Sequence, residues 1–256
     1  MRLLFLLCLF PAAFAAAQEK KPDPKKEPPP KVLYAAPLVA KPGEKQKLAL
    51  RGKGLAAVKE VKLADDGPDG ATVKVLGAKA VPVPNNFPAD RVGDSEVEVE
   101  LDLPKDAKPG SVKLVAVGAG GESNAYTLLI RDALPVVAEK EDNGGFDTAQ
   151  AVSLPCAVEG TVKGERDVDV FKFEGKKGAK LRVEVQAARF GSPLDGFLTL
   201  HDADHKLLAA VDDTDGTPDP ILTVTLPKDG VYFLSLIDAH DLGGPNFGYR
   251  LVIKAE

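Results

Sequence analysis

Apolar and polar residues alternate along most of the chain, as they do in β-strands that have one buried face and one solvated face. The alternation is clearest in 96–103, EVEVELDL, where acidic residues occupy one face and Val or Leu the other. Within 32–131, similar runs are separated by turn signals such as Pro42–Gly43 and Pro109–Gly110. Roughly seven short strands in about 100 residues predict an immunoglobulin-like sandwich.

A second series of strands follows residue 139, and no helical stretch interrupts it. Its segments are GTVKG, DVDVFKFEG, KLRVEVQAA, GFLTLHDA, KLLAAVDD, ILTVTLP, GVYFLSLID and YRLVIKAE. Eight strands of this kind predict a second, jelly-roll-like β-sandwich. The chain is therefore expected to be all-β, with an immunoglobulin-like sandwich followed by a jelly-roll-like one.

The first 17 residues, MRLLFLLCLFPAAFAAA, have a positive charge, a short apolar run and small residues at the end, which predicts a secretory signal peptide cleaved after Ala17. A membrane span needs roughly 20 apolar residues, and no segment reaches that length. Residues 18–31 are rich in Pro and Lys and are interpreted as an extended linker. We expect a protein that is secreted, periplasmic or held at the cell surface, without a membrane span.

Charge and cysteine content exclude one class of partner and one way of stabilising the fold. The formal net charge is −5, and no basic patch is interleaved with aromatic residues, so nucleic acid is not an expected partner. Removal of residues 1–17 leaves Cys156 as the one cysteine, which excludes an intramolecular disulfide. Its surroundings, VSLPCAVEG, are apolar, and we expect a buried side chain.

Both halves of the chain resemble known domain families. In 32–131, the phrases KPGEKQKLALRGKGL and LPKDAKPGSVKLVAVGAGGESNAYTLLI resemble the IPT/TIG type of immunoglobulin-like domain. After a short linker at 132–138, residues 139–256 resemble the bacterial pre-peptidase C-terminal domain. The phrases that carry this second resemblance are NGGFDTAQAV, GTVKGERDVDVFKFEG, LDGFLTLHDADHKLLAAVDD and LPKDGVYFLSLIDAHDLGGPNFGYRLVI.

The second resemblance implies a calcium-binding jelly roll related to the collagen-binding domains of secreted collagenases. Such domains usually accompany a secreted peptidase, and this chain contains no recognisable peptidase. The resemblance also implies that Ca²⁺ is held by acidic positions before and at the start of an early strand. By position these are Glu139, Glu141, Asn143, Asp167 and Asp169.

The residues themselves favour a cation site in the stretch EKEDNGGFDTAQ, which spans 139–150. Its oxygen donors at alternate positions resemble the start of an EF-hand loop, but Gln150 stands where such a loop ends in Glu. Ca²⁺ needs roughly 6 to 8 oxygen ligands, so a second segment must contribute. The best candidate is the acidic pair Asp167 and Asp169, which share one face of a strand. Val168 and Val170 are expected to point the other way, into the core. Solvated carboxylates at a domain junction are the alternative interpretation.

A third acidic stretch and two histidines are weaker candidates. Asp212, Asp213, Asp215 and Asp219 are compatible with a second calcium loop, although the Gly and Pro among them favour a turn between strands. His201 and His205 have the spacing of a helical zinc motif, but LTLHDADHKLL is predicted to be strand, turn and strand. We therefore do not expect a zinc site.

No pattern of catalytic residues stands out. No serine lies in a G-x-S-x-G motif. The absence of Trp disfavours a carbohydrate-binding module, because sugar rings usually stack on aromatic side chains. An exposed Tyr232 or Tyr249 would favour such a module again. The sequence predicts a secreted, non-catalytic accessory or scaffolding protein that binds an extracellular protein or polysaccharide through a calcium-stabilised module. A hydrolase with an unrecognised carboxylate site and a carbohydrate-binding module are the alternatives.

Overall fold

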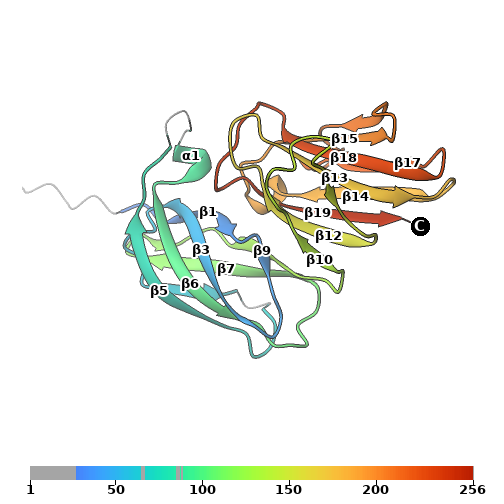
Figure 1. Ribbon diagram of the computed structural model, residues 1–256. Coiled ribbons are helices and arrows are strands. Elements are labelled where there is room, and N and C mark those ends of the chain that lie inside the picture. The colour runs from blue at the N-terminus through green and yellow to red at the C-terminus, as the bar shows by residue number, and fades with distance from the viewer. Residues whose placement is uncertain (1–26, 65–66, 85–86, 88, 256) are drawn as a thin grey trace, which may run out of the picture.

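The computed structural model describes residues 27–64, 67–84, 87 and 89–255, and these residues form four β-sheets (Figure 1). Their helical content is small, consisting of α1 (Ala89–Val92) and the 3-10 helix η1 (Ala188–Phe190). The prediction of an all-β chain is confirmed. The predicted signal peptide and most of the 18–31 linker lie outside the described residues.

The first two sheets come from the N-terminal half of the described chain and have the strand orders β1-β3-β6-β5 and β2-β9-β7-β4, with β8 paired to β7. Their strands are β1 (Lys31–Ala36), β2 (Val39–Ala40), β3 (Lys45–Lys53), β4 (Glu60–Leu63), β5 (Thr72–Ala80), β6 (Ser95–Asp102), β7 (Gly110–Gly118), β8 (Gly121–Glu122) and β9 (Tyr126–Ile130). In β6 the alternation predicted from EVEVELDL places every second side chain in the core. Leu50 and Val97 of one sheet pack in the same buried cluster as Leu114 and Leu128 of the other, which makes this half a sandwich.

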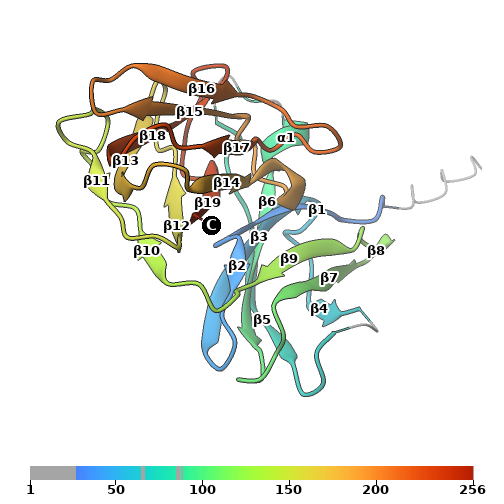
Figure 2. The same cartoon turned by 90° about the vertical axis from the view of Figure 1, so that its right-hand side faces the viewer.

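The other two sheets come from the C-terminal half and have the orders β10-β12-β19-β14-β17 and β11-β13-β18-β15-β16 (Figure 2). Their strands are β10 (Val136–Ala138), β11 (Gln150–Ala151), β12 (Cys156–Thr161), β13 (Val168–Gly175), β14 (Lys180–Gln186), β15 (Gly196–Asp202), β16 (Leu207–Val211), β17 (Ile221–Thr225), β18 (Gly230–Asp238) and β19 (Gly248–Ala255). Phe171 and Leu234 of one sheet and Val183 and Leu251 of the other share one core. Cys156 lies in this core and is fully buried, as expected.

Seven of the eight strands predicted after residue 139 coincide closely with β13 to β19. The remaining prediction, GTVKG, is displaced, because its strand β12 covers Cys156–Thr161, starts in the apolar residues 156–158 and ends before Val162. Residues 136–138, assigned from the sequence to a linker, form β10, which pairs in parallel with β12.

The two sandwiches contact each other through buried polar groups. The Tyr126 hydroxyl accepts a hydrogen bond from the Ala35 N–H at 3.0 Å and donates one to the Phe190 carbonyl at 2.7 Å. Arg250, 3% exposed, donates to Asp132 at 2.5 Å. These contacts join β9 to η1 and β19 to the segment that follows β9.

Gly191 shows how closely the two backbones approach. Its φ is 85°, and a Cβ at this position would lie 2.0 Å from the carbonyl oxygen of Leu33. Any larger residue would meet both the backbone strain of positive φ and a clash with β1. The contact between η1 and the first sandwich therefore requires glycine.

Candidate metal centre

The segment after β10 is held in place by its backbone on both sides. The Glu139 N–H donates to the Glu159 carbonyl at 3.0 Å, which extends the pairing of β10 with β12 by one residue. The Gln150 side chain accepts from the Lys140 N–H at 2.8 Å and donates to the Ala138 carbonyl at 2.9 Å. Gln150, which argued against an EF-hand in the sequence, fastens this segment to β11.

The far end of the same segment lies against β13. The Asn143 carbonyl accepts a hydrogen bond from the Val170 N–H at 3.1 Å. This contact brings residues 139–143, which we call the acidic lead-in, beside Asp169. The acidic lead-in and the start of β13 therefore form one site, although about 25 residues of chain separate them.

Three of the five predicted ligands meet directly. Carboxylate oxygens of Glu139, Glu141 and Asp169 lie within 4.8 Å of one another. Asp167 is close enough that its charge raises the pKa of both Glu139 and Asp169. Asn143 is buried on the acidic lead-in, but no measured contact joins its side-chain amide to the carboxylates.

The valines of β13 point into a small buried cluster, as their apolar character requires, whereas the main core lies on the face of Asp169. Asp169 is 0% exposed and shares its face with Phe171 and Phe173 of the main core. Val170 points to the opposite face, where it packs in a small separate cluster with Ala149 and Phe233. Residues 144–151 cover this outer face. Both faces of β13 are therefore buried, and valine side chains can be buried on either of them.

Several polar atoms at this site have no protein partner. Oε1 of Glu139, Oδ1 of Asp169 and both polar atoms of the Asn143 amide are buried without a hydrogen bond to any described residue. A buried polar atom left unpaired costs about 1–3 kcal/mol. A cation would satisfy the oxygens and leave the amide nitrogen of Asn143 as it is.

The electrostatics of the site favour added positive charge. Burial, followed by the neighbouring carboxylates, raises the pKa of Asp169 to about 7, although Tyr249 donates a hydrogen bond of 2.7 Å to its Oδ2. Burial also raises the pKa of Glu139, and the charge of Glu141 adds to the effect. Acids whose ionised form is penalised in this way gain from a metal ion.

Two residues of this site were not predicted from the sequence to belong to it. Tyr249 comes from β19, 80 residues from Asp169, and nothing local in the sequence connects them. Lys163 places its ammonium 2.6 Å from Oε1 of Glu141. Arg166, which directly precedes Asp167, is exposed, and its backbone N–H donates to the Asp241 carbonyl at 3.1 Å.

The third acidic stretch is divided between two places. Carboxylate oxygens of Asp212 and Asp213 meet that of Asp195 within 4.8 Å, and His240 contacts Asp195 at 3.2 Å. Asp215 is not part of this group. A bridge between Thr214 and Thr217, with Gly216 at φ 83°, forms the turn that the sequence favoured.

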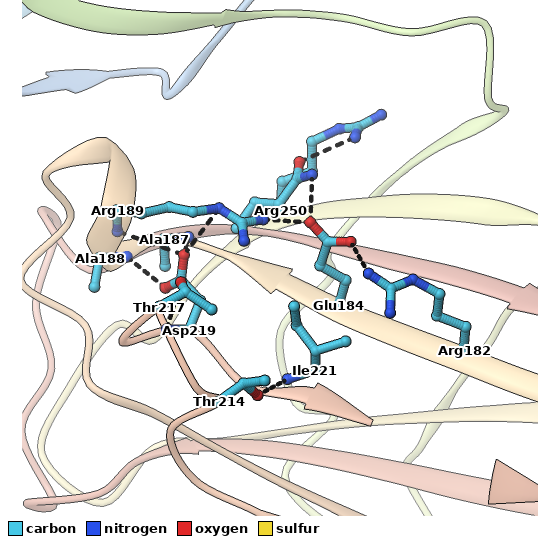
Figure 3. Close-up of polar contacts among 11 residues, drawn as sticks. Arg182, Glu184, Ala187, Ala188, Arg189, Thr214, Thr217, Asp219, Ile221 and Arg250 are labelled. Carbon is cyan, nitrogen blue, oxygen red and sulfur yellow. Dashed lines mark hydrogen bonds and ion pairs between the residues drawn. The ribbon is translucent and has the colours of Figure 1, made fainter. Parts of the chain in front are cut away.

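Asp219 is fully buried and serves η1 (Figure 3). Its carboxylate accepts hydrogen bonds from the N–H groups of Ala187 at 3.1 Å and Ala188 at 2.7 Å. Arg189 lies 3.4 Å from the same carboxylate and also contacts Glu184. The residue therefore organises the turn that carries Phe190 to the first sandwich, and its oxygens are already occupied.

The histidines and tyrosines do not form the surfaces considered in the sequence. Both ring nitrogens of His201 have contacts, one with the His205 carbonyl at 3.2 Å and one with the Thr199 hydroxyl at 3.1 Å. His205 stacks on Phe146 with ring centroids 4.2 Å apart. Tyr232 and Tyr249 are 0% and 2% exposed, so neither offers a ring to a sugar.

Part of the second sandwich is similar to a known domain family. Residues 167–237 match the family model of the bacterial pre-peptidase C-terminal domain. A probable subtilase-type serine protease of Deinococcus radiodurans is 47% identical over 72 residues, which are 28% of this chain and 10% of that relative. The matched family region includes Asp167 and Asp169, whereas the acidic lead-in precedes it.

Among solved structures, the pre-peptidase C-terminal domain of a Bacillus anthracis collagenase is 18% identical, with 41% of this chain and 94% of that one covered and a TM-score of 0.33. The periplasmic g-type lysozyme inhibitor PliG of Aeromonas hydrophila is 12% identical, with 47% and 100% covered and a TM-score of 0.33. In the described residues no helix is long and apolar enough to cross a bilayer. The family match lies within the C-terminal sandwich, where residues 167–237 are similar to the bacterial pre-peptidase C-terminal domain.

Proposed function

We propose that this chain is a secreted, non-catalytic accessory protein whose C-terminal sandwich is a calcium-stabilised binding module. The observation that carries the proposal is the convergence of Glu139, Glu141 and Asp169, two of which have buried oxygens without a partner. Calcium bound there joins the acidic lead-in to β13. It thereby fixes the start of the second sandwich relative to β10.

The donor set suits calcium better than other common metals. Every candidate ligand offers oxygen, and the site has neither a thiolate nor an imidazole, which zinc would favour. Glu139, Glu141, Asp167, Asp169 and the Asn143 amide together supply enough oxygens for much of the 6 to 8 that Ca²⁺ takes, with water completing the shell. Mg²⁺ demands near-ideal octahedral geometry, which an irregular segment beside a strand meets less easily.

Two buried acids of the second sandwich, Asp219 and Asp238, have structural roles, which supports a non-catalytic protein. Asp238 accepts backbone hydrogen bonds from Asp195 at 2.9 Å and His240 at 3.0 Å, and Asp219 accepts those of η1. A buried carboxylate saturated with backbone donors holds a turn and is not free to move a proton. Because Tyr232 and Tyr249 are buried, a stacking platform for sugars lacks its expected rings, which favours a protein ligand over a polysaccharide.

The proposal is tested by adding the full chain to insoluble fibrous proteins and to insoluble polysaccharides, with millimolar calcium or with EDTA. We expect calcium-dependent retention on a protein and no release of soluble fragments. Retention on polysaccharide alone would support the carbohydrate-binding alternative. Turnover that is abolished by substituting one pair of carboxylates would overturn the non-catalytic assignment.

A further inference from the structure

Lys163 lies in the loop between β12 and β13 and is attached to two of the candidate calcium ligands. Its ammonium is 2.6 Å from Oε1 of Glu141. Its backbone N–H donates to Oδ2 of Asp167 at 2.6 Å. Lys163 therefore connects the acidic lead-in with Asp167, just before β13.

The loop conformation explains why the lysine stays there. The Asp167 N–H donates to the Gly164 carbonyl at 3.2 Å, which closes a tight turn directly after Lys163. The Arg166 N–H bonds to Asp241 at 3.1 Å and fixes the outer side of this turn. With its backbone held at both points, Lys163 can reach Glu141 at little cost in chain entropy.

The Lys163 ammonium partly neutralises the negative charge of the acids around it. A lysine side chain is positively charged at neutral pH. The hydrogen bond to Glu141, followed by the charges of the neighbouring acids, raises the pKa of Lys163 further. The contact remains reversible, since the Lys163 and Glu141 side chains are 54% and 35% exposed. An exposed ion pair is weak and exchanges with solvent ions.

A metal ion bound by Glu141 must share that carboxylate with the ammonium or displace it. Two positive charges at one carboxylate repel each other, and the divalent ion gains more from the surrounding acids. We propose that Lys163 is a tethered counter-ion that competes with calcium for Glu141 and so lowers the calcium affinity of the site. This inference rests on the proposed calcium site.

The matched control is Lys140, which lies on the acidic lead-in itself. It is exposed, and no ion pair joins its ammonium to an acid in the part of the chain that the structure describes. Lys163→Gln and Lys140→Gln change the net charge equally, but only the first removes a contact with a ligand. Lys163→Arg keeps the charge and serves as the conservative variant.

The experiment is calorimetric titration of Ca²⁺ into the full chain and its three variants at fixed pH and ionic strength, with melting curves in EDTA. We expect Lys163→Gln to bind calcium about two- to fivefold more tightly than wild type, the range that corresponds to an exposed ion pair. Its melting temperature in EDTA should fall below that of Lys140→Gln, because the pair with Glu141 is lost. Lys163→Arg should stay close to wild type in both measurements.

Equal affinity changes in Lys163→Gln and Lys140→Gln would overturn the inference, because general charge would then explain them. A loss of stability in EDTA without any change in affinity would also overturn it and leave a purely structural ion pair. If neither wild type nor any variant binds calcium, the proposed function itself fails. That outcome is distinguished by the absence of binding heat in all four proteins.

Discussion

The Tyr249 hydroxyl donates a 2.7 Å hydrogen bond to Oδ2 of Asp169, and both residues are buried. Tyr249 belongs to the core of the second sandwich, whereas Asp169 belongs to the acidic site. The bond therefore fixes one candidate ligand against the rigid part of the fold. A carboxylate held in this way needs less ordering when it binds an ion.

Tyr249→Phe should destabilise the protein by about 1–3 kcal/mol and weaken its response to calcium, because the buried Asp169 carboxylate loses the hydroxyl that donates to Oδ2. Melting curves in EDTA and in calcium measure both effects. Tyr232→Phe is the matched control, since its hydroxyl donates to the Lys228 carbonyl at 2.6 Å, away from the acids. A control that lost the calcium response as fully as Tyr249→Phe would contradict the assigned role.

Asp219→Ala should lower stability by roughly 2–4 kcal/mol, because buried N–H groups of η1 lose a charged acceptor. The calcium response should persist, since Asp219 is not among the converging acids. Asp215→Ala, at an exposed position of the same turn, should change neither property. Loss of calcium binding in Asp219→Ala, measured by titration, would instead favour a calcium loop at this turn.

Tyr126→Phe should uncouple the two sandwiches. It leaves the Ala35 N–H and the Phe190 carbonyl without their shared partner. We expect differential scanning calorimetry to show two transitions where wild type shows one, with a loss of about 1–3 kcal/mol in the coupling. One unchanged transition would mean that the other interface contacts suffice.

Cys156 should resist alkylation in the folded protein. Burial raises the pKa of its thiol, so less thiolate forms at pH 8.5 than at an ordinary cysteine, and the reagent has no access. Intact-mass analysis after iodoacetamide treatment should show no adduct until denaturant is added. Rapid labelling of the native chain would contradict the packing around β12.

The strands were predictable where periodicity runs for five residues or more, as in β6 and β18, because burial of one face imposes the pattern. Strands of two residues, such as β2 and β11, contain too few positions to show a period. The predicted position of β12 was displaced because the strand starts with three consecutive apolar residues, 156–158, and such a run shows no alternation that would locate the strand. The single turn η1 depends on Asp219, about 30 residues later, and has no local signal.

The convergence of Glu139, Glu141 and Asp169 could be predicted from the sequence, but their surroundings could not. Closely spaced carboxylates on two segments are visible in the sequence. The sequence did not show that Asp169 lies on the face of β13 that packs against the main core. The reason is that both faces of β13 are covered, one by the main core and one by Phe146 and Ala149. Tyr249 and Lys163 reach the acids only through the fold, so the sequence alone did not indicate them.

We propose that Glu139, Glu141 and Asp169, with Asp167 and Asn143, bind one calcium ion that joins the acidic lead-in to β13. Extracellular modules bind calcium with Kd of roughly 10⁻⁴ to 10⁻³ M, and about ten times Kd stabilises a domain by roughly 1.4 kcal/mol. For a domain of this size that corresponds to a rise of about 5 °C in melting temperature.

The most direct measurement compares melting curves of wild type and Asp169→Ala in EDTA and in millimolar calcium, with limited proteolysis near Gly144 as a second readout. Wild type should melt about 5 °C higher in calcium and be cleaved more slowly there. Asp169→Ala should show neither difference. If wild type melts at the same temperature with EDTA as with millimolar calcium, the acids are solvated carboxylates at a domain junction and the account is wrong.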